Sequence, residues 1–279
     1  MVRETKEGDN MLVNDWKEFL IPYEQAVEEL KVKFKGIRKQ YRDKNQYSPI
    51  EFVTGRVKEI SSILEKAKKL DIPFSKIADE MEDIAGIRIV CQFVEDIYTV
   101  VDLIHQRDGK DLKIVYEKDY VNNQKESGYR SYHIIIKYPV QTTVGEIEIL
   151  AEIQVRTLAM NFWATIEHSL NYKYKQSIPE DIKERLKKTA DLVTELDTEM
   201  SQIKGEIIDA QRTFEIKSSI ISDILDNIIT LYSLGKISES TDIQDRFNKL
   251  LDGGNIYEFE LLLDESNKKV QQYRLEALK

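Results

Sequence analysis

The sequence predicts an α+β protein in which a β-sheet is flanked by helices and followed by long C-terminal helices. The first observation behind this is a group of short segments in the middle of the chain whose apolar residues alternate, as in strands with one buried face. The second is a long run of apolar residues spaced three and four apart after residue 179, which is typical of helices. Apolar residues are 41% of the 279 residues, enough to fill a core.

The N-terminal part is expected to be helical after a polar segment, 1–15, that we expect to be disordered. Between Trp16 and Tyr41 the apolar residues recur at helical spacing, with Pro22 as a possible break. Ser48-Pro49 then reads as the start of a second helix, which would extend to about Leu70 and carry several cations.

The central segments read as strands of one sheet. Residues 86–94, 112–116, 132–138 and 146–155 have strand character, with a helix predicted at 97–105 between the first two. If the apolar sides of these strands pack on helices, the opposite face of the sheet collects Arg88, His133, Glu152 and Gln154. A solvated sheet face without function is the alternative interpretation.

The chain is predicted to be helical from residue 158 onward. One helix is expected at 158–174, and a long one after Pro179 carries a heptad seam that must pack on this subunit or on a copy of it. The seam comprises Ile182, Leu186, Thr189, Val193, Leu196, Met200, Ile203, Ile207, Ala210 and Phe214. Residues 215–279 read as a helical extension, so that the main domain would be 16–214.

Charge and cysteine content restrict the class of protein. A formal net charge of -9 is unlike that of a protein that coats nucleic acid, so any anion must bind at a local basic patch. The single cysteine, Cys91, lies in an apolar run and reads as an inert buried thiol, which suits a cytoplasmic setting. No apolar stretch has the length of a membrane span, and the three histidines do not form a zinc motif.

Four segments, 54–58, 83–88, 125–133 and 152–164, hold residue types that phosphoryl-type transfer requires. Asp83 and Glu152 are carboxylates that can share a magnesium ion, and Tyr129 offers a ring for stacking on a base. Cations able to hold polyphosphate are Arg56, Lys58, Arg88, Lys125 and Arg130. No single one of these features is specific, because an Asp and a Glu far apart in sequence are usually unrelated.

In combination, the four segments resemble the synthetase domain of the RelA/SpoT family, most closely its small alarmone synthetases of the RelQ type. The similarity extends from about Trp16 to about Phe214. It implies a mixed sheet related to that of nucleotidyltransferases. It also implies synthesis of ppGpp and pppGpp, in which pyrophosphate moves from ATP to the 3′-hydroxyl of GDP or GTP and AMP leaves. The absence of a His-Asp motif agrees with a synthetase that lacks the hydrolase.

The resemblance also assigns roles to residues. Asp83 and Glu152 match the ligands of Mg²⁺, and Glu152 is also the candidate base for the 3′-hydroxyl. Residues that match contacts to ATP are Arg56, Lys58, Lys66 and Arg88, and residues that match contacts to GDP or GTP are Lys125, Tyr129, His133, Gln154 and Asn161. Lys118 stands where relatives often carry an arginine, which leaves any phosphate role for it open because lysine cannot make the bidentate fork.

A basic stripe on the first helix is a candidate regulatory site. Lys31, Lys35, Arg38 and Arg42 recur at helical spacing, and from the pattern alone a solvated face is the preferred interpretation. The resemblance instead implies an allosteric cleft for pppGpp, formed by Lys31, Lys35 and Arg38 with Phe52 and Thr54. It further implies a homotetramer and binding of single-stranded RNA. A tRNA-modifying pyrophosphokinase and a catalytically silent RNA- or nucleotide-binding regulator are the alternative functions.

Overall fold

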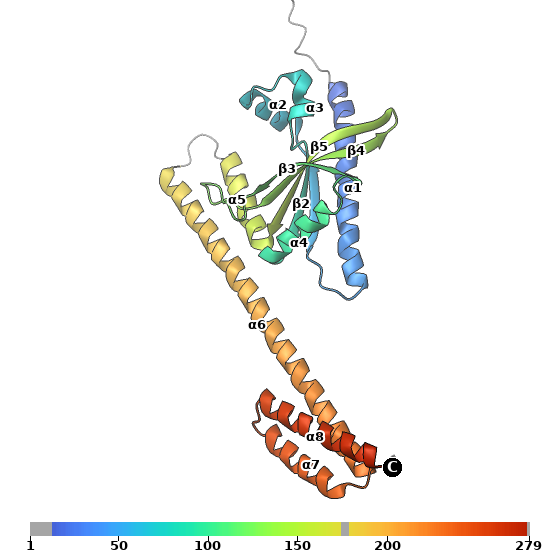
Figure 1. The fold of residues 1–279 in the computed structure, drawn as a ribbon. Coiled ribbons are helices and arrows are strands. Elements are labelled where there is room, and N and C mark those ends of the chain that lie inside the picture. The colour runs from blue at the N-terminus through green and yellow to red at the C-terminus, as the bar shows by residue number, and fades with distance from the viewer. Residues whose placement is uncertain (1–12, 174–178, 278–279) are drawn as a thin grey trace, which may run out of the picture. The chain divides into compact units, whose positions relative to one another are not determined.

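The computed structural model describes residues 13–173 and 179–277, and the chain divides into two compact units, 1–201 and 202–279 (Figure 1). The boundary between the units falls within α6 (Glu180–Ser233), as does Phe214, where the main domain was expected to end. Residues 1–12, most of the segment expected to be disordered, lie outside the described residues, and α1 begins at Val13.

Unit 1 is built on a five-stranded sheet with the order β1-β2-β5-β4-β3. Only β2 and β5 are parallel neighbours, and the other three pairs are antiparallel, so the sheet is mixed as expected. The strands are β1 (Phe52–Val57), β2 (Ala85–Cys91), β3 (Lys113–Asp119), β4 (Tyr132–Thr142) and β5 (Gly145–Thr157).

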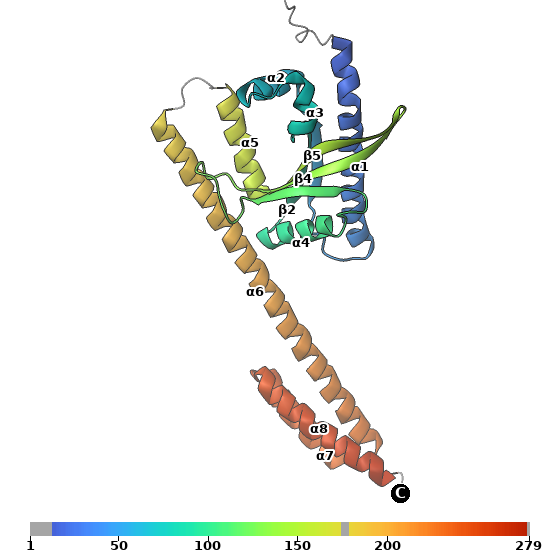
Figure 2. The ribbon, with the colours of Figure 1, turned by 45° about the horizontal axis from the view of Figure 1, so that its top comes forward.

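The helices of unit 1 bury one face of that sheet. The long α1 (Val13–Asp43) and α4 (Val94–His105) pack on β-strand residues such as Ile87, Ile134 and Ile153, all of which are buried (Figures 1 and 2). Pro22 lies within α1 without ending it. The remaining elements of this unit are α2 (Ile60–Lys69), a 3₁₀ turn (Phe74–Lys76), α3 (Ile77–Glu80) and α5 (Leu158–Lys173).

The helix predicted from Ser48-Pro49 to Leu70 is wrong over its first half, which is strand β1. The Ser48 hydroxyl accepts the backbone N–H of Ile50 at 3.2 Å, a local turn instead of a helix cap. Residues 52–57 contain three β-branched side chains and pair antiparallel with β2. Arg56 therefore lies on a strand and Lys58 follows it, and neither lies on a helix.

Unit 2 is a small helical bundle with its own core. It consists of the C-terminal part of α6, α7 (Ile237–Leu251) and α8 (Ile256–Ala277). Its buried side chains are Ile220, Ile224, Ile228, Leu231, Ile243, Phe247, Phe259, Leu262 and Val270. Gly235, with φ of +75°, allows the chain to turn after α6. None of the described helices has the length and apolarity needed to cross a membrane.

The predicted apolar seam of α6 packs only in part. Its N-terminal section contacts α5, since the Trp163 indole N–H donates to the Thr189 hydroxyl at 3.0 Å and Val193 packs beside it. From Leu196 onward the seam is open, and Phe214 is 73% exposed. A long apolar face of the helix is therefore uncovered within a single chain.

Candidate functional site

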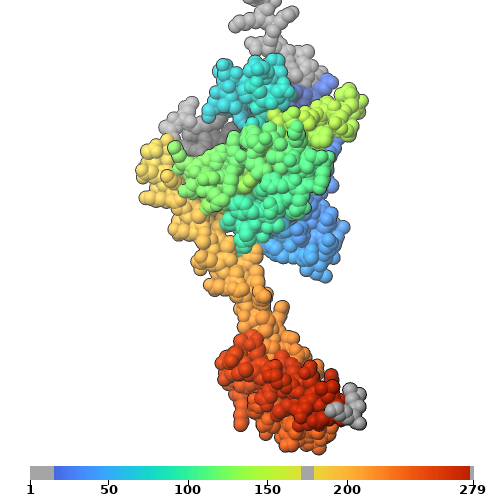
Figure 3. Space-filling model, viewed as in Figure 1, coloured from blue at the N-terminus to red at the C-terminus, as the bar shows by residue number. Residues whose placement is uncertain are grey.

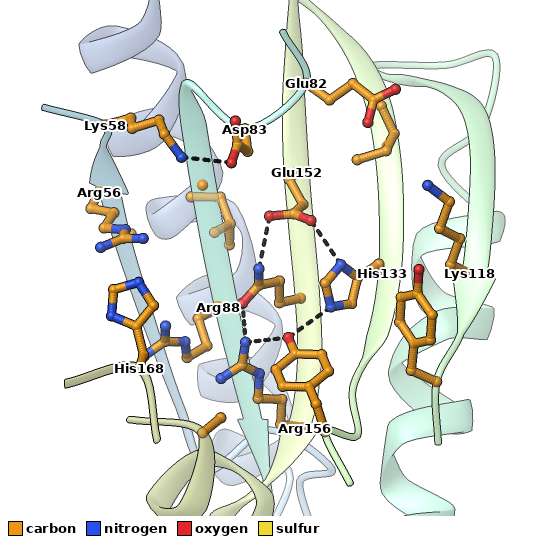
Figure 4. Close-up of a pocket in the computed structure, with 18 of the residues that line it drawn as sticks. Arg56, Lys58, Glu82, Asp83, Arg88, Lys118, His133, Glu152, Arg156 and His168 are labelled. Carbon is orange, nitrogen blue, oxygen red and sulfur yellow. Dashed lines mark hydrogen bonds and ion pairs between the residues drawn. The ribbon is translucent and has the colours of Figure 1, made fainter. Parts of the chain in front are cut away.

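The polar face of the sheet forms the floor of a cleft of about 600 Å³ (Figure 4). Side chains alternate along each strand, so residues two apart share this face while their neighbours enter the core. Strand register aligns them in two rows across the sheet. One row is Thr54, Arg88, Gln154, His133 and Lys118, and the other is Arg56, Gly86, Glu152, Ile135 and Tyr116.

A closed ring of hydrogen bonds occupies the centre of the cleft. His133 Nδ1 and Gln154 Nε2 each lie 2.7 Å from a different oxygen of Glu152, and Tyr129 Oη lies 2.8 Å from His133 Nε2. Arg156 closes the ring, since its guanidinium donates to Tyr129 Oη at 2.7 Å and to the side-chain oxygen of Gln154. The five side chains thereby hold one another in place.

The ring fixes the direction of each hydrogen bond. A carboxylate only accepts, so His133 donates its Nδ1–H to Glu152, and in the neutral imidazole Nε2 then accepts from the Tyr129 hydroxyl. Burial works to raise the pKa of Glu152, but the hydrogen bonds from His133 and Gln154 outweigh it and leave the pKa below its ordinary value. Glu152 is therefore an ionised, oriented carboxylate at neutral pH.

The second carboxylate of the cleft, Asp83, has hydrogen-bond partners in the described part of the chain at only one of its two oxygens. Its Oδ2 accepts from Lys58 Nζ at 2.8 Å and from Lys66 Nζ at 2.9 Å. Burial would raise the pKa of Asp83, yet these two ammonium groups outweigh it and lower the pKa. Its Oδ1 is buried and has no hydrogen-bond partner among the described residues.

Asp83 and Glu152 are suited to hold a divalent cation together with phosphate groups. Mg²⁺ is usually bound by one or two carboxylates and completed by water and substrate phosphates, and the unpartnered Asp83 Oδ1 is an oxygen of the required kind. The described residues contain no cluster of three or more His, Cys, Asp or Glu side chains that would hold an ion without such phosphates.

Cations outnumber acids in the cleft although the chain as a whole is acidic. The cations are Arg56, Lys58, Lys66, Arg88, Lys118, Lys125 and Arg156, against the acids Glu82, Asp83, Glu152 and Glu167. The pKa of Arg88 is lowered by burial and by the nearby Arg156 and Arg56, and its Nε has no partner in the described part of the chain. Such crowding of positive charge favours a polyanionic ligand.

The loop before β4 presents Lys125 and Tyr129 to the cleft. Gly128 adopts φ of +87°, and a Cβ there would come within 2.5 Å of Ala190 Cβ on α6, so only glycine fits without displacement. Lys125 Nζ lies 4.9 Å from the centre of the Tyr129 ring and 4.5 Å from that of Tyr120. Burial lowers the pKa of Lys125.

The cleft brings together nearly all the residues predicted for nucleotide binding. Its lining includes Arg56, Lys58, Lys66, Asp83, Arg88, Lys125, Tyr129, His133, Glu152 and Gln154. Asn161, on α5, does not line it, and its side-chain oxygen is buried without a partner among the described residues. His168, to which the sequence analysis gives no role, also lies at the cleft (Figure 4).

The predicted allosteric residues surround β1 but face different ways. Strand alternation directs Val53 and Gly55 toward α1, whereas Phe52, Thr54 and Arg56 point to the opposite face, and Thr54 lines the cleft. On α1, Lys31 pairs with Glu28 at 2.7 Å, Arg38 pairs with Glu51 at 3.3 Å, and Lys35 is exposed.

The sequence analysis missed several residues of the cleft. Arg156 continues the alternation of Glu152 and Gln154, so the strand pattern was sufficient to place it on this face. Lys118 was named but not placed on this face, because the strand predicted at 112–116 ends three residues before β3 does, and Tyr116 at the end of that predicted strand was given no role. No feature of the sequence around Glu82 indicated that it lies in the cleft, where it accepts a hydrogen bond from the Tyr116 hydroxyl.

Comparison with known proteins identifies the family of this chain. Residues 55–177 match a region found in RelA and SpoT proteins. The GTP pyrophosphokinase YjbM of Bacillus subtilis is 57% identical over 202 residues, which are 72% of this chain and 94% of that protein. The chain belongs to the RelA/SpoT family. The predicted resemblance is thus confirmed, and pyrophosphokinases of this family typically use a divalent metal.

Two solved structures share the fold. Small alarmone synthetase 1 from Bacillus subtilis, bound to its product pppGpp, is 57% identical and superposes with a TM-score of 0.67 over 70% of this chain and 98% of its own. The same synthetase bound to AMPCPP matches with 55% identity and a TM-score of 0.63, over 70% of this chain and 99% of its own. The RelA/SpoT relatives therefore account for the synthetase fold and leave more than a quarter of this chain unmatched.

Proposed function

We propose that this RelA/SpoT chain is a small alarmone synthetase, which transfers pyrophosphate from ATP to the ribose 3′-hydroxyl of GDP or GTP and releases AMP. The observation that carries the proposal is the pair of ionised carboxylates, Asp83 and Glu152, within a cleft dominated by cations. The 57% identical relative is named a GTP pyrophosphokinase, and small alarmone synthetase 1 was solved with pppGpp and with the adenosine nucleotide AMPCPP.

The two nucleotides occupy opposite sides of the carboxylate pair in this proposal. Arg56 and Arg88 hold the adenine of ATP, and Lys58 and Lys66 hold its phosphates next to Asp83. On the other side, the Tyr129 ring stacks on guanine. Lys125, His133 and Gln154 surround the rest of the guanosine nucleotide, and Asn161, whose side-chain oxygen is buried, reaches it only if that side chain moves. Cations on both sides neutralise the phosphates that must approach one another.

Glu152 is the candidate base for the transfer. The 3′-oxygen attacks the β-phosphorus of ATP, the bond from that phosphorus to the oxygen bridging to the α-phosphate breaks, and AMP takes the bridging oxygen. The hydroxyl proton passes to Glu152, whose orientation is set by His133 and Gln154. Asp83 and Glu152 would hold Mg²⁺, which supplies neutralisation of phosphate charge when bound.

The acceptor distinguishes this proposal from its alternatives. Incubation of the protein with ATP labelled in its β-phosphate and with GDP, GTP or tRNA should place the label on the guanosine nucleotide, read by thin-layer chromatography. Label on tRNA would indicate the tRNA-modifying relative, which the acidic chain does not favour. If none of the acceptors became labelled, the protein would be the catalytically silent regulator that only binds RNA or a nucleotide.

For regulation, assembly and location, we propose a homotetramer in the cytoplasm that responds to pppGpp through Lys31, Lys35, Arg38, Phe52 and Thr54. Gly55, between Thr54 and Arg56 on β1, lies against the side chain of Lys31, which provides a short route from α1 to the cleft. Single-stranded RNA is a second anionic partner that suits the same cations.

Replacement of Lys35 and Arg38 by Ala should leave basal synthesis intact and remove the response to added pppGpp. Both side chains belong to α1 and lie outside the cleft lining, so the chemistry is not touched. The measurement is a titration of pppGpp during turnover, with Lys39→Ala as the control because Lys39 is on the same helix but pairs with Asp43 off the stripe. If the double variant responded to pppGpp like the parent, the basic stripe on α1 would be only a solvated face or would bind RNA instead.

A further inference from the structure

Unit 2 carries an apolar groove between α6 and α7 that nothing in the unit covers. The groove has a volume of about 310 Å³. Its lining contains no charged side chain and consists of Leu225, Ile228, Ile229, Tyr232, Ser240, Gln244, Phe247 and Asn248. Two of the α6 residues at its rim, Ile229 and Tyr232, are 62% and 64% exposed. A monomer that leaves such side chains in water has an unpartnered docking surface.

The α6 side of this groove belongs to a stripe with an 11-residue repeat. Ile203, Phe214 and Leu225 are eleven apart, as are Ile207, Ser218 and Ile229, and again Ala210, Ile221 and Tyr232. Eleven residues complete slightly more than three helical turns, so the stripe follows the helix with little drift. We call these nine residues, all within unit 2, the α6 stripe.

The first half of the α6 stripe has no cover from unit 2. Residues 203–214 precede the bundle core, which begins at Ile220, and Figure 3 shows this orange part of α6 without α7 or α8 beside it. Ile207 and Phe214 are 53% and 73% exposed. Unit 2 therefore presents a bare apolar helix at one end of the stripe and an open apolar groove at the other.

We infer that the α6 stripe binds the α6 stripe of a second copy of this chain in antiparallel orientation, so that residues 203–214 of each copy fill the α6–α7 groove of the other. A two-fold axis near Ser218 sets Ile203 opposite Tyr232, Ala210 opposite Leu225 and Phe214 opposite Ile221. An interface of this kind is isologous, because each surface is complementary to itself.

The dimensions and chemistry of the stripe support this occupant. From Ile203 to Tyr232 the stripe is about 44 Å long at 1.5 Å per residue, which no small ligand spans. The small residue Ala210 lies opposite the larger Leu225 and Ser218 lies next to the axis, so the helices can approach closely. The uncharged groove accepts an apolar helix without burying an unpaired charge.

The groove of the inferred contact lies outside the part of the chain that resembles small alarmone synthetases. The named relatives match about 70% of this chain and nearly all of their own length. The resemblance ends at about Phe214, so residues 203–214 of the α6 stripe lie within the part shared with the relatives, and the groove residues 225–248 lie beyond it. The contact thus rests on residues 203–248 alone and does not depend on the proposed activity.

Ile207→Glu and Ile208→Glu form a matched pair that tests the contact in the full chain. Both residues are isoleucines on the same exposed segment, 53% and 52% exposed, but Ile208 points about 100° away from the α6 stripe. Sedimentation equilibrium of Ile207→Glu, and separately of Ile229→Glu, should show an assembly with about half the mass of the parent, because each isologous contact joins two copies. Ile208→Glu should retain the parental mass, and equal masses for all variants would overturn the inference.

Cysteine cross-linking tests the orientation. Mild oxidation of the Ala210→Cys/Leu225→Cys double variant should give a covalent dimer on a non-reducing gel, whereas Ala210→Cys alone should not. Native Cys91 is fully buried and stays out of the reaction. A dimer from Ala210→Cys alone would mean parallel helices, and no dimer from the double variant would mean that another molecule occupies the groove, so either result contradicts the antiparallel contact.

Discussion

Glu152→Gln is expected to reduce alarmone synthesis by about 10²–10⁴-fold, the usual loss when a positioned acid or base is removed. The substitution keeps the size of the side chain and an oxygen that can accept from His133. It removes the negative charge, and with it the proton acceptor and one candidate ligand for Mg²⁺. The measurement is the rate of AMP release and of labelled pppGpp formation from saturating ATP and GTP.

A matched control for this variant lies on the same strand. Glu148→Gln changes the same residue type four positions earlier on β5, where Glu148 pairs with Lys137 at 2.9 Å outside the cleft. Its rate and thermal unfolding temperature should equal those of the parent. If Glu152→Gln retained more than about a tenth of the activity, its role as base would be excluded.

Tyr129→Ala is expected to raise the KM for GDP and GTP by about 5- to 150-fold, since loss of a stacking ring costs about 1–3 kcal/mol. The KM for ATP should change far less, because the residues proposed for adenine, Arg56 and Arg88, are on β1 and β2. Steady-state kinetics with each nucleotide varied in turn would measure both values. An equal rise in KM for ATP and for the guanosine nucleotides would identify Tyr129 as a structural residue.

Tyr129→Phe separates the ring from the hydroxyl. Phenylalanine keeps the aromatic face but removes the oxygen that bridges Arg156 and His133. The guanosine KM should therefore stay near the parental value while kcat falls, because His133 and through it Glu152 lose a positioning contact. A guanosine KM as high as that of Tyr129→Ala would contradict stacking as the function of the ring.

Strong periodicity made the sheet and the centre of the cleft predictable from sequence. Glu152 and Gln154 alternate with fully apolar neighbours on β5, so their shared face followed from spacing alone. The assignment of Arg56 and Lys66 to ATP and of Tyr129 to guanine came only from the resemblance to synthetases, because a cation or a ring does not by itself identify the nucleotide that it binds. Those roles remain predictions.

Features that depend on long-range pairing were not predictable in the same way. Strand β1 is six residues long with Gly55 inside it, and only its pairing with β2 distinguishes it from the start of a helix. The position of Asn161 away from the cleft depends on how α5 rotates against the sheet, which local sequence does not specify. The partial burial of the α6 seam depends likewise on tertiary contacts with Trp163.

The closed ring around Glu152 has a thermodynamic consequence for mutagenesis. Arg156 does not touch Glu152, yet it holds Gln154 and Tyr129, each of which is one or two hydrogen bonds from that carboxylate. Free-energy losses at Arg156 and His133 should therefore be non-additive, with the double variant losing less than the sum of the single ones. The ring behaves as one cooperative unit, so most of the loss arises when its first member is removed.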